Sequence, residues 1–156
     1  MKIVRADDCP FVPWRNGGGR TRELLAWPDA NDWLVRISVA EIEADGPFSA
    51  FAGIDRCFAV LDGAGVVLSL PHGQVRLTPH DDAVSFAGEA APMCHLIDGS
   101  TRDLNLMVRR GTGRASMQRA PHNGQRWRGV FDHGTLWWSD DPNEALPTVA
   151  GWYLAV

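Results

Sequence analysis

Hydrophobic and polar positions alternate along this chain in short runs, and turn residues separate one run from the next. In the clearest run, residues 33–40, the odd positions are Trp, Val, Ile and Val, and the even positions include Arg36 and Ser38. Side chains alternate between the two faces of a strand, so this pattern predicts a strand with one apolar face. No long interval shows the 3.6-residue apolar stripe of a helix. We therefore predict an all-β fold with little helix.

Other short apolar runs predict further strands, at residues 57–61, 66–70, 74–77, 83–87, 93–97, 103–109, 113–118, 127–131, 135–139 and 148–154. The four strands between residues 57 and 87 follow one another closely, and we expect them to form an antiparallel meander. Roughly twelve strands are more than a six-stranded barrel requires, which leaves open extra strands or two linked half-barrels. Gly and Pro are spread throughout and no linker stands out, so we expect a single domain over residues 1–156.

Composition narrows the classes of function. The chain is 45% hydrophobic, as a globular protein should be, and its net charge of −4 disfavours binding to nucleic acid or to an anionic membrane. Cys9, Cys57 and Cys94 form no CxxC pair, and their odd number argues against a disulfide framework. The sequence has neither an apolar leader segment near Met1 nor a transmembrane-length apolar stretch. We expect a cytoplasmic protein.

The first segment with candidate chemistry is residues 13–23, PWRNGGGRTRE. Its three consecutive glycines could present backbone N–H groups as an anion-binding nest, or form a tight turn anchored by the tryptophan. It is not a phosphate-binding P-loop, because no Gly-Lys-Ser/Thr sequence follows. Its candidate ligand-binding side chains are Asn16, Arg20, Arg22 and Glu23.

The second segment is residues 45–56, DGPFSAFAGIDR, in which Phe48 and Phe51 resemble core plugs beneath a loop. Arg56 is the candidate binding residue of this segment. An arginine can hold a carboxylate through two parallel hydrogen bonds, a contact that lysine cannot make. The alternative is a surface ion pair between Asp55 and Arg56, which would contribute little.

The third segment is residues 103–110, DLNLMVRR. Strand alternation places Asp103, Asn105, Met107 and Arg109 on one face, with leucine and valine on the other. Methionine prefers burial, so this mixed face suits the inside of a barrel that holds a polar ligand. The alternative is an ordinary outer face with Met107 half covered.

These three segments, in this order and spacing, closely resemble the motifs of the HutD/Ves family. The resemblance implies a cupin-like β-barrel, with a bicupin-like arrangement in one short chain as a variant. It also implies an association with histidine utilisation in bacteria, where such proteins modulate the pathway. Formylglutamate or urocanate is the ligand that the resemblance implies.

Metal and nucleophilic chemistry have weaker support. Many cupins bind a metal through two histidines one residue apart, and the histidines at 72, 80, 95, 122 and 133 never have that spacing. We therefore expect neither a metal nor another cofactor. Cys57 and Cys94 lie in apolar strands, where a buried structural thiol is the default, and no Gly-x-Ser-x-Gly elbow is present.

The interpretation that we favour is a binding or sensing protein for a small carboxylate. Arg56 and Arg109 would hold the carboxylate, and Asn105 would hold a second polar end of the ligand. One alternative is a metal-independent enzyme acting on a small acid, with Glu23, Asp55 or Asp103 as acid–base groups. Another is a partner-binding module with an exposed apolar patch. The sequence leaves the oligomeric state open, a homodimer included.

Overall fold

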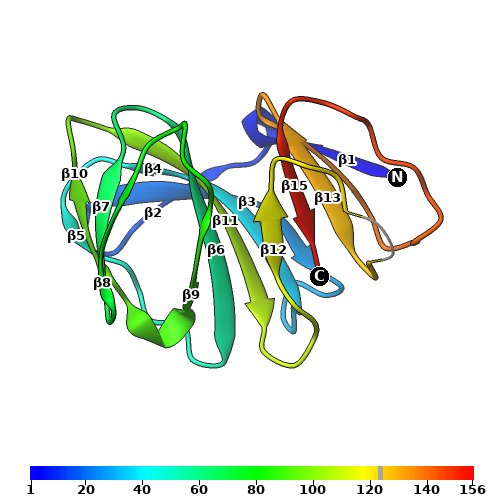
Figure 1. Cartoon of the computed structure of the whole chain (residues 1–156), viewed down its shortest axis with the longest axis horizontal. Coiled ribbons are helices and arrows are strands. Elements are labelled where there is room, and N and C mark those ends of the chain that lie inside the picture. Colours follow the sequence, from blue (N-terminus) through cyan, green and yellow to red (C-terminus); the bar gives the residue numbers. More distant parts are fainter. Residues whose placement is uncertain (123–124) are drawn as a thin grey trace.

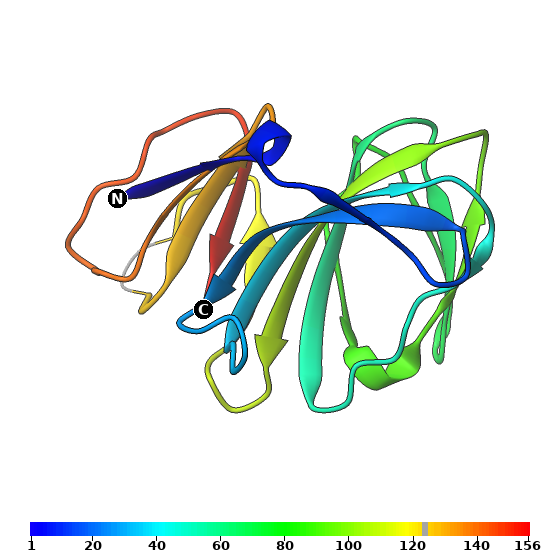
Figure 2. The same ribbon diagram turned by 180° about the vertical axis from the view of Figure 1, so that it is seen from behind.

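The computed structural model describes residues 1–122 and 125–156, and β-strands make up most of it (Figure 1, Figure 2). Among these residues the helical elements are two short 3₁₀ turns, η1 (Ala6–Asp8) and η2 (Gly88–Ala90). In the described part of the chain, no helix is long and apolar enough to span a bilayer. The expected all-β fold is confirmed.

A six-stranded antiparallel sheet forms the centre of the molecule. Its strands, in spatial order, are β2 (Phe11–Pro13), β3 (Gly19–Trp27), β4 (Val35–Ile42), β11 (Thr101–Arg109), β6 (Ile54–Asp62) and β9 (Val84–Ala87). The three predicted strands with the strongest pattern, 33–40, 57–61 and 103–109, become its middle strands β4, β6 and β11.

Two smaller sheets cover the two faces of this central sheet. The four-stranded sheet has the order β5 (Gly46–Pro47), β10 (Met93–Leu96), β7 (Val66–Leu70) and β8 (Gly73–Leu77). The five-stranded sheet has the order β1 (Lys2–Arg5), β14 (Thr135–Ser139), β13 (Arg128–Asp132), β15 (Trp152–Ala155) and β12 (Ser116–Gln118). Figure 1 shows the four-stranded sheet on the left and the five-stranded sheet on the right, with β3, β6 and β11 between them.

Strand alternation gives the central sheet two different buried faces. One face carries Val35 and Ile37 of β4 with Leu104 and Leu106 of β11, and it packs on the tryptophan-rich five-stranded sheet. The other face contributes Phe58 and Val60 of β6 to a second core shared with the four-stranded sheet, as well as a set of polar side chains. The wholly aliphatic face of β11 is therefore core, and its mixed face points into the barrel.

The expected meander between residues 57 and 87 is wrong except for its β7–β8 pair. Strand β6 pairs with β11 and β9, whereas β7 pairs with β8 and β10. The turn at Gly63 and Gly65 carries the chain from one sheet to the other, with φ of +96° and +110°. A Cβ on Gly65 would clash with the Leu77 carbonyl oxygen, so this crossing requires glycine.

Candidate functional site

A cavity of about 730 Å³ lies on the barrel-facing side of the central sheet. Strands β3, β4, β6 and β11 contribute to its walls, and the segments 12–16 and 47–51 complete them. All three sequence motifs therefore meet at one place. Six of the nine candidate residues line the cavity: Asn16, Glu23, Arg56, Asp103, Asn105 and Met107.

The strand register explains why polar groups gather on this face. Asn105 of β11 lies opposite Ser38 of β4, and Met107 lies opposite Arg36 of β4 on one side and Arg56 of β6 on the other. Residues directly opposite each other in a sheet point to the same face. The polar positions of three neighbouring strands consequently form one continuous wall.

Arg56 is the main positive group of the cavity. Its guanidinium lies 5.1 Å from the ring centre of Phe86, 5.3 Å from that of Phe48 and 5.4 Å from that of Phe51. The residue is only 4% exposed, and its Nε and Nη1 have no hydrogen-bond partner among the described residues. Burial lowers the pKa of Arg56 to about 10, against the opposing effect of Asp103, so the guanidinium stays charged at neutral pH.

Asp103 and Asn105 face the same cavity without satisfying their hydrogen-bonding capacity. Asp103 is 1% exposed, and the Oδ1 atoms of both side chains lack a partner in the described part of the chain. Burial raises the pKa of Asp103 to about 8, although the nearby charge of Arg56 lowers it in part. At neutral pH this carboxyl is mostly protonated, so it does not neutralise Arg56.

The cavity rim is more exposed, and several of its polar groups are paired. Arg36 donates to Glu23 at 2.7 Å, which matches one positive charge with one negative charge. Asn16 Oδ1 accepts a hydrogen bond from the Gly18 N–H at 2.8 Å. Nε1 of Trp14, in the cavity wall, donates to Thr21 Oγ1 at 2.7 Å. Gly17 and Gly18 thus lie in a tight turn beside a tryptophan anchor, and Gly19 begins β3.

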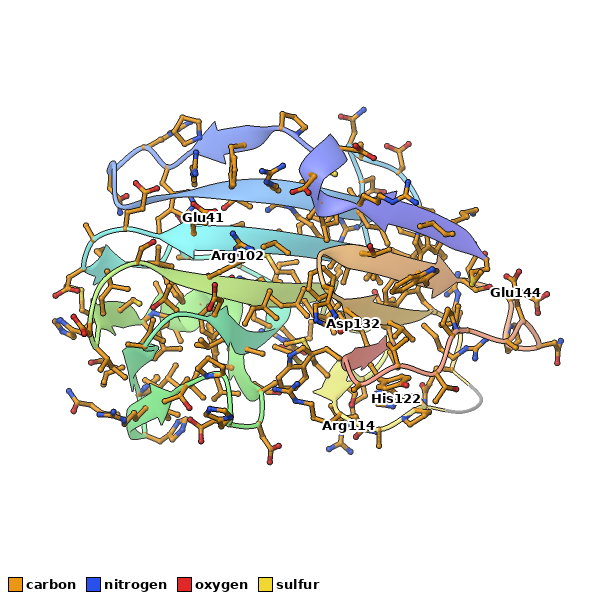
Figure 3. All side chains as sticks on the ribbon, turned by 90° about the horizontal axis from the view of Figure 1, so that it is seen from above. Glu41, Arg102, Arg114, His122, Asp132 and Glu144 are labelled. Atoms are coloured by element: carbon orange, nitrogen blue, oxygen red, sulfur yellow. The ribbon has the colours of Figure 1, made fainter. Side chains whose placement is uncertain are left out.

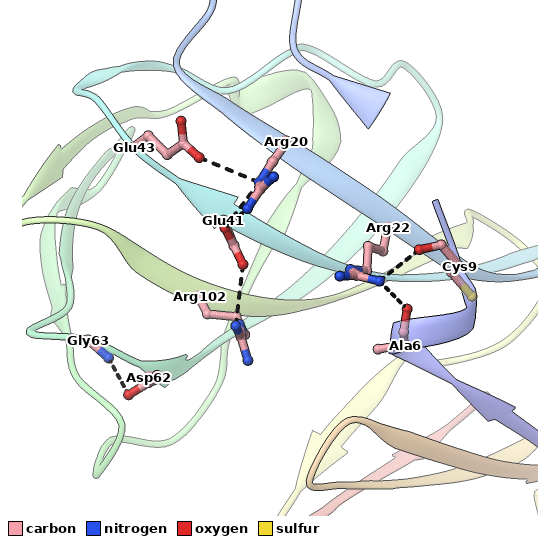
Figure 4. Close-up of polar contacts among 9 residues, drawn as sticks. All are labelled: Ala6, Cys9, Arg20, Arg22, Glu41, Glu43, Asp62, Gly63 and Arg102. Carbon is pink, nitrogen blue, oxygen red and sulfur yellow. Dashed lines mark hydrogen bonds and ion pairs between the residues drawn. The ribbon is translucent and has the colours of Figure 1, made fainter. Parts of the chain in front are cut away.

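Two of the candidate arginines, Arg20 and Arg22, lie outside this cavity. Arg20 forms an ion pair with Glu41 at 2.8 Å, and Arg22 donates to the backbone carbonyls of Ala6 and Cys9 (Figure 4). Both occupy even positions of β3, and alternation turns them away from the face that carries Glu23. We therefore correct the expectation that they share the cavity with the other motif residues.

Arg109 also departs from its expected position. It shares strand parity with Asp103, Asn105 and Met107, but it is the last residue of β11 and does not line the cavity. Its half-exposed side chain forms an ion pair with Asp32 at 2.8 Å. Arg109 therefore shares a face of β11 with the cavity residues, but its position at the end of the strand leaves it outside the cavity.

A second cavity, of about 430 Å³, lies at the junction of the central and five-stranded sheets. Figure 3 shows two of its lining residues, Glu41 and Arg102, on neighbouring strands, and a third, Asp132, on the five-stranded sheet. Glu41 pairs with Arg102 at 3.3 Å and with Arg20, and Arg22 is held by backbone carbonyls (Figure 4). Because these charges already have partners, the larger cavity is the better candidate for binding an ionic ligand.

Several residues of the larger cavity were not predicted as binding residues from the sequence: Trp14, Arg15, Arg36, Ser38, Phe48, Phe51 and Phe58. The signal for Arg36 and Ser38 was present, since both lie on the polar face of the strand predicted over 33–40. Nothing in one sequence shows that this face meets the polar face of residues 103–109. That adjacency comes from the pairing of β4 with β11.

In the described part of the chain, neither cavity holds a cluster of metal ligands. Over residues 1–122 and 125–156, no group of three or more His, Cys, Asp or Glu side chains could hold a metal ion. Cys57 and Cys94 are buried, as expected for structural thiols, and burial raises the pKa of both. The chemistry available in the larger cavity is that of arginine, amide and carboxyl groups.

Sequence comparison supports the motif-based resemblance. The HutD family model matches residues 6–138. A protein from the hutC 3′ region of Pseudomonas putida is 38% identical over 122 residues, which are 76% of this chain and 63% of that protein. Protein Ves of Cronobacter sakazakii is 38% identical over 120 residues, 76% of this chain and 66% of that protein. The matches thus span slightly less than two thirds of these two relatives.

Solved structures agree over nearly the whole chain. HutD from Pseudomonas fluorescens SBW25, in a structure described as the formate condition, superposes with a TM-score of 0.83 at 28% identity. The superposition covers 98% of this chain and 95% of that one. A conserved protein of unknown function from Pseudomonas aeruginosa PAO1 gives a TM-score of 0.78 at 27% identity, over 99% of this chain and 90% of that one. The expected cupin-like architecture is confirmed.

Proposed function

Because the chain belongs to the HutD family, which is associated with histidine utilisation, we propose that it binds a small carboxylate in the larger cavity and so modulates that pathway. The observation that carries this proposal is Arg56, a buried guanidinium whose Nε and Nη1 have no partner among the described residues. Burying an unpaired charge is costly, and a bound anion would remove that cost. A carboxylate fits a guanidinium through two parallel, charge-assisted hydrogen bonds.

The other walls suggest what the rest of the ligand resembles. Asn105 and Asp103 offer oxygen atoms that have no partner among the described residues, whereas Trp14, Phe48 and Phe58 offer apolar surface. A small acid with a second polar group would use both kinds of wall. Formylglutamate and urocanate meet this description, with formylglutamate the leading candidate. Formate, named in the description of the Pseudomonas fluorescens structure, is the smallest carboxylate to test.

Titration calorimetry with formylglutamate, urocanate, glutamate and formate tests the proposal. We expect at least one of them to bind below the millimolar range. Arg56→Ala should weaken that binding by more than about tenfold, because removing one partner of a buried charged pair commonly costs about 2–5 kcal/mol. Arg109→Ala is the matched control and should change the affinity less than about twofold, since surface ion pairs contribute little. If none of the four acids binds, the proposal is wrong and a partner-binding role gains support.

An enzyme acting on a small acid is the second candidate, and Asp103 is the observation that favours it. A buried carboxyl with a pKa of about 8 beside a substrate carboxylate could act as a general acid. Consumption of the bound acid, lost in Asp103→Asn while binding persists, would support this reading. Binding without turnover would support a sensor.

A further inference from the structure

Asp103 is built into the cavity wall, and among the described residues its Oδ1 receives no hydrogen bond that would stabilise a negative charge. Its neighbours across the sheet are Ala40 on β4 and Val60 on β6, and neither has a side chain that can donate a hydrogen bond. Its Oδ1 has no partner among the described residues, and the residue is 1% exposed. A buried carboxylate normally receives hydrogen bonds or pairs with a cation.

The charged groups around Asp103 supply only part of that stabilisation, through the charge of Arg56. Arg36 on β4 is paired with Glu23 of β3, and Arg15 comes from the loop before the glycine turn. Burial raises the pKa of the Cys94 thiol, on β10, to about 12, and the charge of Asp103 contributes to that rise. Arg56 on β6 is the remaining positive group near Asp103, and among the described residues it forms no ion pair within 4.0 Å.

We infer that Asp103 works as a neutral carboxylic acid whose O–H donates a hydrogen bond to the bound carboxylate, and that its ionisation releases the ligand. This inference rests on the proposed function, since it concerns the same cavity and the same class of ligand. Asp103 and Arg56 would then both donate, one as a neutral group and one as a cation. An ionised Asp103 would instead repel the carboxylate and compete for the Arg56 fork.

Proton linkage follows from this arrangement. Burial raises the pKa of Asp103 to about 8 in the unliganded protein. When only one state binds, the apparent affinity falls with the fraction in that state. One pH unit above the pKa, about one molecule in eleven is protonated, so the affinity should fall about tenfold. A carboxylate bound beside Asp103 favours its protonated form, so binding above neutral pH should take up a proton.

Affinity measured against pH tests the inference, with formylglutamate and formate as probes. For the wild type we expect about tenfold weaker binding at about pH 9 than at about pH 6.5. Asp103→Asn keeps a neutral hydrogen-bond donor at every pH. Its affinity at about pH 6.5 should lie within about threefold of the wild-type affinity, and it should not decrease at higher pH. Asp55→Asn is the matched control. Asp55 is a half-exposed carboxylate that is paired with Arg110 and does not line the cavity, so the fall should persist.

A second measurement needs no variant. Calorimetry of the wild type at about pH 8.5, in two buffers of different ionisation enthalpy, should show uptake of about three quarters of a proton per bound carboxylate, because roughly a quarter of the unliganded molecules are already protonated. Binding that is independent of pH and buffer overturns the inference and leaves the proposed function standing. Failure of both probes to bind at any pH overturns the proposed function, and the inference with it.

Discussion

Arg56 of β6 lies directly opposite Met107 of β11, and this register fixes the guanidinium on the polar face of the central sheet. Phe48, Phe51 and Phe86 surround the guanidinium, each with its ring centre within 6 Å, the range of favourable cation–π contact. Aromatic rings hold the group in place without satisfying its N–H donors. The cavity thus contains a positioned cation whose hydrogen bonds are left for a ligand.

Replacing Asp103 with asparagine should stabilise the unliganded protein at neutral pH. The folded-state pKa of Asp103 is about 8, against an ordinary value of 3.8. Below about pH 3 the carboxyl is mostly protonated in both states, and as pH rises toward 8 ionisation favours the unfolded state alone. Asp103→Asn should therefore gain at least about 1 kcal/mol at pH 7, or about 3 °C in Tm, with the gain vanishing near pH 3. Thermal unfolding of both proteins at the two pH values measures this.

The control for that experiment is Asp62→Asn, which changes an exposed carboxyl outside the larger cavity. Its Tm should stay within about 2 °C of the wild type at both pH values, because surface substitutions usually change stability by less than about 0.5 kcal/mol. An Asp103→Asn variant that is less stable than the wild type at pH 7 would mean that the carboxylate is stabilised in the folded state.

Gly19→Ala should destabilise the cavity wall. A Cβ on Gly19 would lie 2.5 Å from the Glu41 carbonyl oxygen and 3.1 Å from the Trp14 ring. Such overpacking typically costs about 1–3 kcal/mol, and displacement of Trp14 should also weaken ligand binding. Urea denaturation measures the first effect and calorimetry the second. Gly46→Ala is the control, because a Cβ on Gly46 would lie 3.6 Å from its nearest neighbour, Asn16 Nδ2, which is an ordinary van der Waals contact. Equal losses in the two variants would contradict this account.

The alternation of apolar and polar residues was sufficient to predict the middle strands of the central sheet. Residues 33–40, 57–61 and 103–109 alternate strongly, and each became a middle strand of the central sheet. The long strand β3 was missed, because it begins at Gly19 and its sequence, GRTRELLAW, has no clean alternation. A register irregularity between Glu23 and Leu25 interrupts the pattern. Missing β3 also left Arg20 and Arg22 with no assigned face, so they were grouped with Glu23.

The part of the candidate site that lies on a single predicted strand could be predicted from the sequence. The alternation of residues 103–109 was enough to place Asp103, Asn105 and Met107 on one face. The position of Arg109 depends on how far the cavity extends along β11, which no local pattern encodes. The meander failed for a similar reason, since turn residues at Gly63 and Gly65 mark a change of direction but do not tell which sheet the next strand joins.

Glu23→Gln should strengthen carboxylate binding. Glu23 pairs with Arg36 at 2.7 Å, and removing its charge leaves Arg36 as a second positive group on the cavity wall. Both side chains are partly exposed, so the gain should be modest, about twofold to fivefold, and should shrink in high salt. Titration calorimetry at two ionic strengths measures it. Glu43→Gln removes a partner of Arg20 outside the cavity and should leave affinity unchanged. Weaker binding in Glu23→Gln would indicate that Glu23 contacts the ligand directly.

The neighbouring residues Asn105 and Leu106 should respond in opposite ways to substitution, because they face opposite sides of β11. Leu106 is fully buried between the central and five-stranded sheets, so Leu106→Ala should cost about 2–5 kcal/mol of stability. Its effect on affinity, measured well below the unfolding transition, should be small.

Asn105 Oδ1 already lacks a partner among the described residues, so Asn105→Leu should cost little stability. It should nevertheless weaken ligand binding at least about fivefold, since it removes a polar wall group. Chemical denaturation and calorimetry on both variants separate the two effects. A large stability loss in Asn105→Leu together with unchanged affinity would show that the amide serves the fold and not the ligand.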